Sequence, residues 1–414
     1  MAATPSSPRR VGVLAHASVL DRSGYARRVL DAAGLVRRAL PEAKVSVVSV
    51  ESPRRLRDRA AREEVQAALA RDGVDLVVVH AWPRRAGLAR LSDALAARAV
   101  RRWARRAHAE VLHAHGPRAV RTALAASKHA LAVVADVHGD RAAETRLERG
   151  EPDTEATPPD PREAEPVRRA SAVVYASEAL ARRFPADPAR PTAVVPCLVA
   201  DERIPSDEAA EAERLARRRG YGLSGDEWVV AYAGSLAPWQ EVPRVLAAVR
   251  HATERVPQLR LLLLTPARNE AQALVARAGI APGRVLVRSP GPDEVVAHLL
   301  GADGAVLLRR PALANTLAFP TKLAEYLAAG LEVVASDAVP CVAATLARGP
   351  GAGHVVPWAA DDATWAARIA GAARPGTAAE RAARRTLARR TLALSTGVTA
   401  YRDLYARLGT RPAG

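Results

Sequence analysis

The sequence predicts an α/β protein with two doubly wound, Rossmann-like domains, and three observations predict it. The chain has 414 residues, which is too long for one ordinary core and long enough for two domains of about 150 to 200 residues each. Short β-branched runs alternate with longer Ala-, Leu- and Arg-rich segments of helical period, as in parallel sheets built from βαβ units. This alternation stops near the middle of the chain and then restarts.

The first half of the chain contains the first series of expected strands. Several of them are continuous Val-rich runs, as expected when helices cover both faces of a sheet. The expected strands are 11–15, 44–50, 75–80, 111–115, 131–136, 172–176 and 192–195.

A charged segment, 200–226, follows the first series and is expected to be an interdomain linker with a short helix. The alternation then restarts, and the tail, 378–408, has the pattern of two Arg-rich helices. The strands expected in this half are 228–233, 259–265, 285–287, 305–308, 332–336 and 354–356.

One segment, 147–165, departs from the alternation because it contains four prolines and many acidic residues. Such a composition buries too little apolar surface to order itself, so we expect a mobile loop. An active-site lid and an inert surface insertion are both consistent with it.

The composition limits the classes of function. The formal net charge is +17, and the only lysines are Lys44, Lys128 and Lys322, an Arg bias that GC-rich coding alone can produce. An anionic ligand such as a sugar diphosphate, an acidic membrane surface and nucleic acid are the functional explanations. Nucleic acid is disfavoured because the Arg residues are spread along the chain and aromatic residues are too scarce for stacking.

No apolar run approaches the ~20 residues of a spanning helix, and residues 1–10 lack the apolar core of a signal peptide. Cys197 and Cys341 are too few and too isolated for a disulfide framework or a zinc site. We therefore expect a cytoplasmic protein, with the inner face of the membrane as a further location.

The stretch with the most chemical information is 309–330, RRPALANTLAFPTKLAEYLAAG. The strand expected at 305–308 delivers Arg309 and Arg310 into a loop, and Pro320 then opens a helix. Free backbone N–H groups at a helix start attract anions. This loop is therefore a candidate site for a diphosphate.

Three polar residues fall in the first turns of that helix. Thr321 and Lys322 lie at its start, where the Lys322 ammonium adds a full positive charge. Glu325 lies one turn later, where its carboxylate can accept hydrogen bonds from both hydroxyls of a ribose. The alternative is an amphipathic helix with a Lys/Glu pair on a solvated face.

Further motifs surround this stretch in a fixed order. They are HAHG (113–116), DVHGD (136–140), YASEAL (175–180), VVPCLV (194–199), AYAGSLAPWQ (231–240) and ADGAVLLRR (302–310). With NTLAFPTKLAEYLAAG (315–330), they make the chain resemble the retaining GT-B glycosyltransferases of family 4 along nearly its whole length.

The resemblance implies two Rossmann-like domains that face each other across a cleft, the GT-B fold. Residues 1–199 would bind the acceptor and 227–376 the nucleotide-sugar, with a linker at 200–226 and C-terminal helices at 377–414. The implied partners are a nucleotide-sugar donor and a sugar, lipid-linked or small-molecule acceptor, with peripheral membrane association as an option. No cofactor and no metal are implied.

Roles follow residue by residue from the resemblance. The catalytic group would comprise His138, Lys322 and Arg309, with the two cations neutralising the donor diphosphate and His138 facing the transferred sugar. A hydrogen-bonded histidine at a strand end is the alternative for His138. The donor-binding set would be Gly234, Ser235, Arg310, Asn315, Thr321, Lys322 and Glu325. The set for the acceptor or transferred sugar would be Ser23, Gly24, His115, Asp136 and Gly139.

The sequence departs from the commoner family pattern in three places. Leu317 stands where many relatives have the first of two glutamates, Ser235 and Gln240 replace an Arg and a Lys, and 196–198 is Pro-Cys-Leu in place of Pro-Asn-Gly. These departures increase the demand on the remaining basic residues to balance a diphosphate.

The sequence disfavours two other ligand types, a metal ion and a dinucleotide. His113 and His115 share a strand face and could serve as metal ligands with His138, but no carboxylate or Cys cluster accompanies them, so we expect no metal. The first loop, 21–25, lacks a full G-x-G-x-x-G, which argues against a dinucleotide cofactor, although Ser23 and Gly24 suit a close approach to a ligand.

The sequence therefore predicts a retaining, metal-independent glycosyltransferase in which the diphosphate departs as the acceptor attacks the same face. Electrostatic stabilisation of that leaving group would be its largest catalytic contribution. A non-catalytic GT-B-like scaffold or activator subunit is the main alternative. Leu317, Ser235 and Gln240 favour it, and the intact Lys322, Glu325 and His138 oppose it. A nucleotide-sugar epimerase on the same fold is a third.

Overall fold

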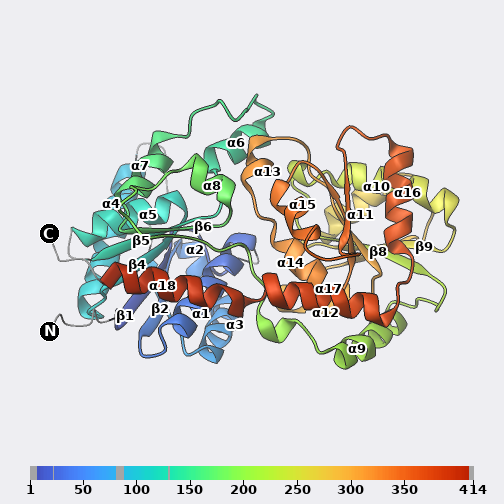
Figure 1. Cartoon of the computed structure of the whole chain (residues 1–414). Coiled ribbons are helices and arrows are strands. Elements are labelled where there is room, and N and C mark those ends of the chain that lie inside the picture. The colour runs from blue at the N-terminus through green and yellow to red at the C-terminus, as the bar shows by residue number, and fades with distance from the viewer. Residues whose placement is uncertain (1–6, 22, 81–87, 129–130, 410–414) are drawn as a thin grey trace. The chain divides into compact units, whose positions relative to one another are not determined.

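The computed structural model describes residues 7–21, 23–80, 88–128 and 131–409, and it divides into two compact units (Figure 1). Each unit contains one wholly parallel sheet with helices packed on it, which confirms the predicted α/β class. The first unit consists of Met1–Glu144, Ala156–Pro196 and Gly397–Gly414, and the second of Thr145–Glu155 and Cys197–Thr396.

The first unit is built on a seven-stranded sheet of order β3-β2-β1-β4-β5-β6-β7. Its strands are β1 (Arg10–Ala15), β2 (Lys44–Glu51), β3 (Asp75–His80), β4 (Val111–His115), β5 (Ala132–Val137), β6 (Ala172–Tyr175) and β7 (Thr192–Val194). Its helices are α1 (Gly24–Ala39), α2 (Pro53–Leu56), α3 (Arg59–Arg71), α4 (Ala89–Arg106), α5 (Gly116–Ser127), α7 (Pro161–Arg169), α8 (Glu178–Arg183) and α18 (Val398–Gly409), and α6 (Arg141–Arg149) has residues in both units.

Close packing of helices on the sheet explains the residue choice in the central strands. β1 pairs with β2 on one side and β4 on the other, and all its residues after Arg10 are buried. Gly12 is required because a side-chain Cβ there would lie 2.6 Å from ring carbons of Trp103 on α4. The strand order reverses direction between β1 and β4, and ligands of doubly wound sheets bind beyond the carboxyl ends of strands at such a point.

The second unit is built on a six-stranded sheet of order β10-β9-β8-β11-β12-β13. Its strands are β8 (Trp228–Ala233), β9 (Leu259–Leu264), β10 (Val285–Arg288), β11 (Gly304–Leu307), β12 (Glu332–Ser336) and β13 (Gly353–Val356). Its α-helices are α9 (Asp207–Gly220), α10 (Val242–Arg255), α11 (Arg268–Arg277), α12 (Val295–Leu299), α13 (Leu313–Leu317), α14 (Thr321–Ala328), α15 (Pro340–Leu346), α16 (Asp362–Ala373) and α17 (Ala378–Thr391). Its short 3-10 helices are η1 (Asp201–Arg203), η2 (Pro238–Gln240), η3 (Pro292–Glu294) and η4 (Leu394–Gly397).

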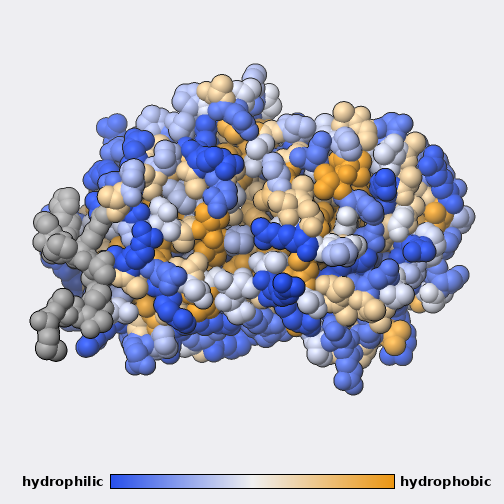
Figure 2. Space-filling model, in the orientation of Figure 1, coloured by the Kyte–Doolittle hydropathy of each residue, from blue (hydrophilic) through white to orange (hydrophobic). Residues whose placement is uncertain are grey.

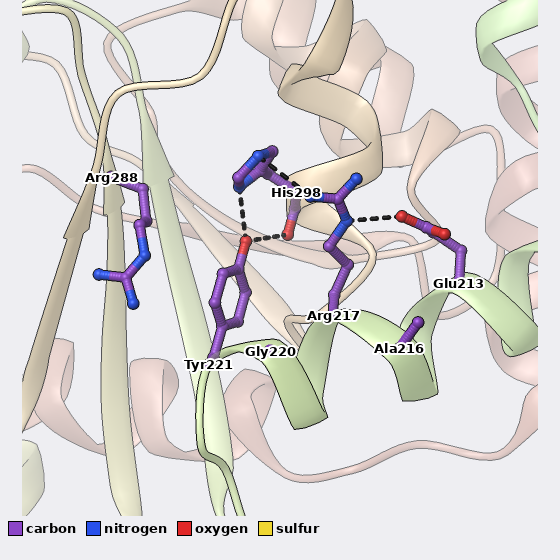
Figure 3. Close-up of a pocket in the computed structure, with 7 residues that line it drawn as sticks. All are labelled: Glu213, Ala216, Arg217, Gly220, Tyr221, Arg288 and His298. Carbon is purple, nitrogen blue, oxygen red and sulfur yellow. Dashed lines mark hydrogen bonds and ion pairs between the residues drawn. The ribbon is translucent and has the colours of Figure 1, made fainter.

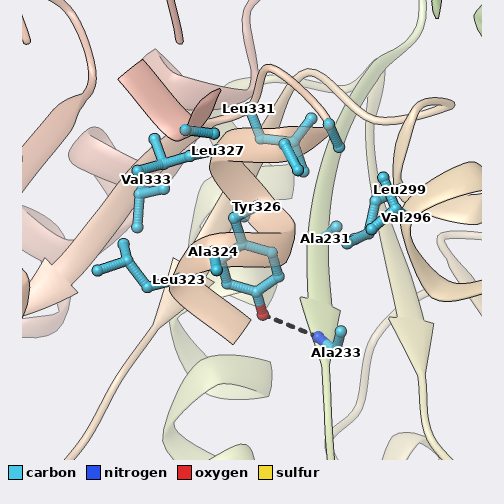
Figure 4. Packing of buried hydrophobic residues seen from close by; sticks show 14 of the residues in the cluster. Ala231, Ala233, Val296, Leu299, Leu323, Ala324, Tyr326, Leu327, Leu331 and Val333 are labelled. Atoms are coloured by element: carbon cyan, nitrogen blue, oxygen red, sulfur yellow. Dashed lines mark hydrogen bonds between the residues drawn. The ribbon is translucent and has the colours of Figure 1, made fainter. Parts of the chain in front are cut away.

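The buried tyrosine Tyr326 fixes α14 against the middle of the second sheet (Figure 4). Its hydroxyl accepts from the backbone N–H of Ala233 at 2.9 Å and lies 3.3 Å from the carbonyl of Val306, to which it donates. These two residues belong to β8 and β11, the strands on either side of the point where the strand order reverses. The start of α14 is thereby held next to the carboxyl ends of both strands.

Every expected strand is present, and each of its ends lies within one residue of the expected position. The expected tail helices are α17 and α18, but they belong to different units, α17 to the second and α18 to the first. None of the helices in the described part of the chain has both the length and the apolar composition that crossing a membrane requires.

The segment expected as a linker, 200–226, is instead a packed part of the second unit. It contains η1 and α9, and from α9 the side chains of Arg214 and Arg218 form buried ion pairs with Asp303. Asp303 Oδ2, the oxygen that pairs with Arg218, also accepts from the backbone N–H of Val229 at 2.9 Å. Burial of Asp303 beside two arginines therefore fixes α9 to the start of β11.

The segment 147–165, expected as one mobile loop, is helical at both ends because α6 continues to Arg149 and α7 begins at Pro161. Asp160 caps α7 by accepting from Arg162 N at 2.8 Å. Between the helices, Asp153 lies 3.1 Å from Arg146 in an ion pair. Local capping and ion pairing thus order more of this segment than its composition suggests.

Candidate functional site

A cationic centre forms in the second unit where β8, β11 and the start of α14 meet, and we define it as Gly234, Arg309 and Lys322. Gly234 follows β8, and its φ of +138° lies in a region that favours glycine. A Cβ there would lie 3.1 Å from Lys322 Nζ, so a side chain would press on the ammonium. The centre lies at the carboxyl ends of the strands where the sheet order reverses, the usual ligand position in such sheets.

Lys322 is buried, and its ammonium is bonded to a neutral group. Nζ donates to Gln240 Oε1 at 2.8 Å and lies 4.2 Å from the ring centroid of Tyr232. Burial, and then the nearby Arg309 guanidinium, lower the pKa of Lys322 well below its usual value of 10.5, against an opposing effect of Glu325. A negative charge at this point would restore the stability of the ammonium form.

Arg309 is held on several sides by polar groups. Its Nη1 donates to Asn315 Oδ1 at 2.9 Å, and its backbone N–H donates to Ser336 Oγ at 3.0 Å. The Ser336 hydroxyl in turn donates to the Arg309 carbonyl at 2.7 Å. The guanidinium is therefore oriented before any ligand binds, which reduces the entropy lost on binding.

Asn315 and Arg310, both expected in the donor-binding set, have other partners in the structure. Asn315 is buried, and its amide is used by Arg309 Nη1 and by the carbonyl of Arg310, to which its Nδ2 donates at 2.8 Å. Arg310 Nε lies 2.5 Å from Glu241 Oε1 in an ion pair. Asn315 therefore positions Arg309, and Glu241 balances the charge of Arg310, whose role at a diphosphate stays a prediction.

The start of α14 presents Thr321 and, one turn later, Glu325. Pro320, expected as the first helical residue, is instead the N-cap, one position before Thr321, and it provides no side-chain cap. Glu325 Oε1 accepts from Arg203 Nη2 at 3.3 Å, and the same Nη2 donates to the carbonyl of Pro292 at 2.8 Å. Arg203 thus orients the carboxylate that we expect at a ribose.

Ser235, the remaining expected donor residue, is exposed directly after the glycine turn. Its carbonyl accepts from the Tyr232 hydroxyl at 2.6 Å, which fixes the turn. Its side chain therefore remains available to a ligand at the edge of the cationic centre.

A polar cluster lies at the carboxyl ends of β4 and β5 in the first unit, and we define the histidine cluster as His113, His115, Asp136 and His138. Asp136 is fully buried, and Arg28 donates to both of its oxygens, at 3.3 and 3.2 Å. His138 is half-buried, and its Nδ1 lies 3.3 Å from Asp136 Oδ1. If Nδ1 carries the proton, Asp136 accepts it as a hydrogen bond and Nε2 is left to meet a ligand.

Burial and opposing charges set the electrostatics of this cluster. Burial raises the pKa of Asp136, but Arg28, then His115, and hydrogen bonds from His113 and His138 outweigh it and hold the pKa well below 3.8. Burial lowers the pKa of His115 well below 6.5, so this imidazole is neutral near pH 7. The cluster therefore contains one anion, which Arg28 balances.

Two expected sugar-binding residues, His115 and Asp136, are thereby corrected to interior positions. Both are buried, and the ring of His115 lies between those of His113 and His138, at 5.2 and 6.1 Å between centroids. Among the described residues of the cluster, only His138 has an exposed side-chain surface. It is the member that can contact a substrate directly.

His113, His115 and Asp136 also bring three potential metal-ligand atoms within 4.8 Å of one another. Asp136 thus supplies a carboxylate beside these histidines, which their sequence neighbourhood did not indicate. Arg28 donates to both oxygens of this carboxylate, and its positive charge would repel a cation placed there. We therefore still predict that this cluster binds no metal, because Arg28 occupies both oxygens of Asp136.

The other expected residues of the first unit are Ser23, Gly24 and Gly139. Ser23 is the N-cap of α1, and its Oγ accepts from Ala26 N at 3.2 Å. Gly24 is open, since nothing lies within 4 Å of a Cβ placed there. A Cβ on Gly139 would lie 2.5 Å from Glu144 Oε1, so this glycine leaves room for the Glu144 carboxylate.

Several residues that hold these groups in place have no local sequence signal. Arg28 and Arg203 are two arginines in an arginine-rich chain, and nothing in their neighbourhood distinguishes them. Tyr401 and Tyr405 lie on α18, far along the chain from the cluster. Tyr405 Oη lies 2.9 Å from His113 Nδ1, and Tyr401 donates to Asp136 Oδ2 at 3.4 Å.

Comparison with protein families decides the class of protein. Residues 22–203 match the family model described as Glycosyltransferase Family 4, and residues 227–374 match that of Glycosyl transferases group 1. The chain is a glycosyltransferase. The two matches lie on different parts of the chain, with 204–226 between them. No curated protein sequence is similar enough to this glycosyltransferase to count as a match.

Solved structures show that this glycosyltransferase has the GT-B fold. The Anabaena protein HepE in complex with UDP-glucose has a TM-score of 0.68 at 16% identity, over 95% of this chain and 98% of that one. Sucrose-phosphate synthase from Thermosynechococcus elongatus has a TM-score of 0.68 at 15% identity, over 96% and 98%. WaaG, a glycosyltransferase involved in lipopolysaccharide biosynthesis, has a TM-score of 0.61 at 15% identity, over 97% and 100%.

Proposed function

We propose that this glycosyltransferase is a family 4 hexosyltransferase that moves a sugar from a nucleoside diphosphate sugar to an acceptor hydroxyl, with retention of configuration. The observation that carries the proposal is the cationic centre. Lys322 and Arg309 are both buried and are bonded to the neutral amides of Gln240 and Asn315. A diphosphate would supply the negative charge that a buried ammonium beside a guanidinium needs.

The donor would bind along the carboxyl edge of the second sheet. Its diphosphate would lie against Lys322 and Arg309, where Gly234 lets the backbone approach it. Its ribose would lie one turn along α14 at Glu325, whose carboxylate Arg203 already orients. The presence of UDP-glucose in the structural neighbour HepE supports a donor of this kind.

Chemistry would follow from stabilisation of the departing diphosphate. As the bond to the sugar breaks, negative charge grows on the leaving oxygen, and preorganised cations stabilise that charge more than they stabilise the substrate. No cofactor is needed for this step, because Lys322 and Arg309 supply the positive charge that a divalent metal supplies elsewhere.

His138 would contact the transferred sugar or the attacking hydroxyl. Asp136 accepts from Nδ1 and thereby leaves the Nε2 lone pair directed away from the cluster, where it can accept from a hydroxyl. In this proposal the first unit contributes His138, and the second unit contributes the cations Lys322 and Arg309.

We further infer that the acceptor is lipid-linked and that the protein acts in the cytoplasm at a membrane surface. The support is an exposed apolar face at the start of α4. Leu88, which precedes the helix, and Leu91 and Leu95 within it are 49%, 55% and 37% exposed. Arg98 and Arg102 continue the same face at helical spacing. Within the described ranges, neither arginine pairs with an acidic side chain.

Such a face suits the surface of an anionic bilayer. Leucines can enter the headgroup region while arginines at the other end of the face meet lipid phosphates. Elsewhere, on the face of the molecule in Figure 2, hydrophilic residues predominate and hydrophobic residues form small patches among them. An apolar run followed by a basic run on one helix is therefore a local feature, distinct from the general excess of arginine.

A panel of UDP-, GDP- and dTDP-sugars tests the proposal by thermal shift and by product analysis with a hydroxyl acceptor. We expect one nucleotide series to raise the melting temperature and to give a glycoside of retained anomeric configuration. Neither stabilisation nor product with any donor would favour the scaffold alternative, which the neutral Ser235, Gln240 and Leu317 suggest. Donor isomerisation without an acceptor would favour the epimerase.

A further inference from the structure

A pocket of ≈ 390 Å³ opens in the second unit between the end of α9, the outer strand β10 and α12 (Figure 3). The polar side chains that line it are Glu213, Arg217, Tyr221, Arg288 and His298. β10 lies three strands from β11, which leads to the cationic centre, and three strand spacings are about 14 Å. The pocket is therefore separate from the residues to which we assign the donor diphosphate.

Two arginines from different elements give this pocket its charge. Arg217, on α9, is paired with Glu213 at 2.5 Å. Arg288, at the end of β10, lies over the ring of Tyr221 at 5.4 Å and donates to the carbonyl of Val287 at 3.0 Å. In the part of the chain that the structure describes, no acidic side chain pairs with Arg288. One positive charge in the pocket is thus left without a balancing carboxylate.

His298 adds no charge, and its hydrogen bonds are already assigned. Burial, and then Arg217, lower its pKa, so the imidazole is neutral and has one N–H. Arg217 Nη1 lies 3.2 Å from Nε2 and can only donate, so the proton is on Nδ1, which donates to the Tyr221 hydroxyl oxygen at 2.7 Å. The Tyr221 hydroxyl donates in turn to the His298 carbonyl at 3.3 Å.

The tyrosine also stays neutral, since burial raises the pKa of Tyr221 to about 12. Tyr221 and His298 therefore line one side of the pocket with polar atoms that already have hydrogen-bond partners. The donors left to a ligand are guanidinium N–H groups of Arg288 and of Arg217. The Arg288 guanidinium lies beside the Tyr221 ring, and Arg217 lies on the His298 side of the pocket (Figure 3). The planar Arg288 guanidinium can donate two hydrogen bonds to an anion with several oxygens.

We propose that this pocket is a second anion site and that it binds a phosphoryl group, carried either by a small phosphomonoester or by a lipid headgroup. A phosphoryl dianion at Arg288 balances the charge that no carboxylate balances there. The proposal goes beyond sugar transfer, because it does not depend on what the cationic centre binds.

Calorimetric titration of the full chain with glycerol 3-phosphate tests the proposal. Arg288→Gln should weaken binding by about ten- to hundredfold, the effect of losing charge-assisted hydrogen bonds. Arg288→Lys keeps the charge but loses the planar guanidinium group. Its affinity should therefore lie between those of the wild type and Arg288→Gln. Arg277→Gln, which removes an exposed charge from α11 in the same unit, should bind as the wild type does.

Lys322→Met separates this pocket from the cationic centre, which could also bind phosphate. Glycerol 3-phosphate binding that survives Lys322→Met and is lost in Arg288→Gln supports the pocket. Binding that is lost in Lys322→Met, or that is equal in wild type and Arg288→Gln, overturns the proposal, as does no binding by wild type in either assay. Vesicles of phosphatidate, with phosphatidylcholine vesicles as the control, show which molecule carries the phosphoryl group. If the wild type binds phosphatidate vesicles and Arg288→Gln does not, the phosphoryl group belongs to a lipid.

Discussion

Replacing Lys322 by Met separates a ligand-binding lysine from a structural one. The methionine keeps the length of the side chain and removes the ammonium, its hydrogen bond to Gln240 and its contact with the Tyr232 ring. In return, a buried cation next to Arg309 disappears, and burying such a charge costs several kcal/mol. The lost hydrogen bond and ring contact together contribute about 1 to 3 kcal/mol.

The two effects oppose each other, so the melting temperature without ligand should stay unchanged or rise in Lys322→Met. Affinity for UDP should fall by about 1.5 to 3 kcal/mol, the range for a charge-assisted contact, which is about ten- to a hundredfold. Calorimetry with UDP and differential scanning calorimetry measure both quantities. Lys44→Met, which removes a lysine from the surface of the other unit, should change neither by much.

Proton linkage gives a second readout of the same residue. The folded chain binds the Lys322 proton less tightly than the unfolded chain, whose pKa is near 10.5. Stability of the wild type relative to Lys322→Met should therefore rise with pH, from the lowered pKa of the folded state up to about 10.5. A bound diphosphate raises that pKa again, so UDP binding should take up protons. Unchanged UDP affinity in Lys322→Met, together with a lower melting temperature, would refute the reasoning.

The remaining predictions concern the first unit. His138→Ala should cut turnover by about a hundredfold with UDP affinity unchanged, whereas a structural histidine would instead lower the melting temperature at near-normal specific activity. Asp136→Asn should destabilise the protein by about 3 to 5 kcal/mol, because Arg28 then stays buried without its anion, and an unchanged denaturation midpoint would contradict this. Replacing both Leu91 and Leu95 by Ser should reduce sedimentation with vesicles of phosphatidylglycerol. Replacing the exposed Leu215 of α9 by Ser, a matched control, should not reduce it. Equal losses in the two variants would argue against α4 as the membrane contact.

The parallel strands and the residues of α14 were predictable from the sequence because their signals are local. A Val-rich run between two helical segments forms a strand of a covered sheet wherever it occurs, and each strand was placed to within one residue. Lys322 and Glu325 are one helical turn apart, so their position at the start of α14 followed from spacing alone. Residues that are close in the sequence thus determine the local arrangement of Lys322 and Glu325 in the candidate donor site.

Only the tertiary structure decided which charges are available. Glu241 balances Arg310, and Arg203, 122 residues before Glu325, orients that carboxylate. Tyr401 reaches Asp136 across 265 residues of chain, in a cluster where Arg28 forms an ion pair with that carboxylate. An ion pair depends on where side chains end after helices and sheets have packed, and burial then decides how strongly each pair acts. Neither quantity is encoded in local periodicity.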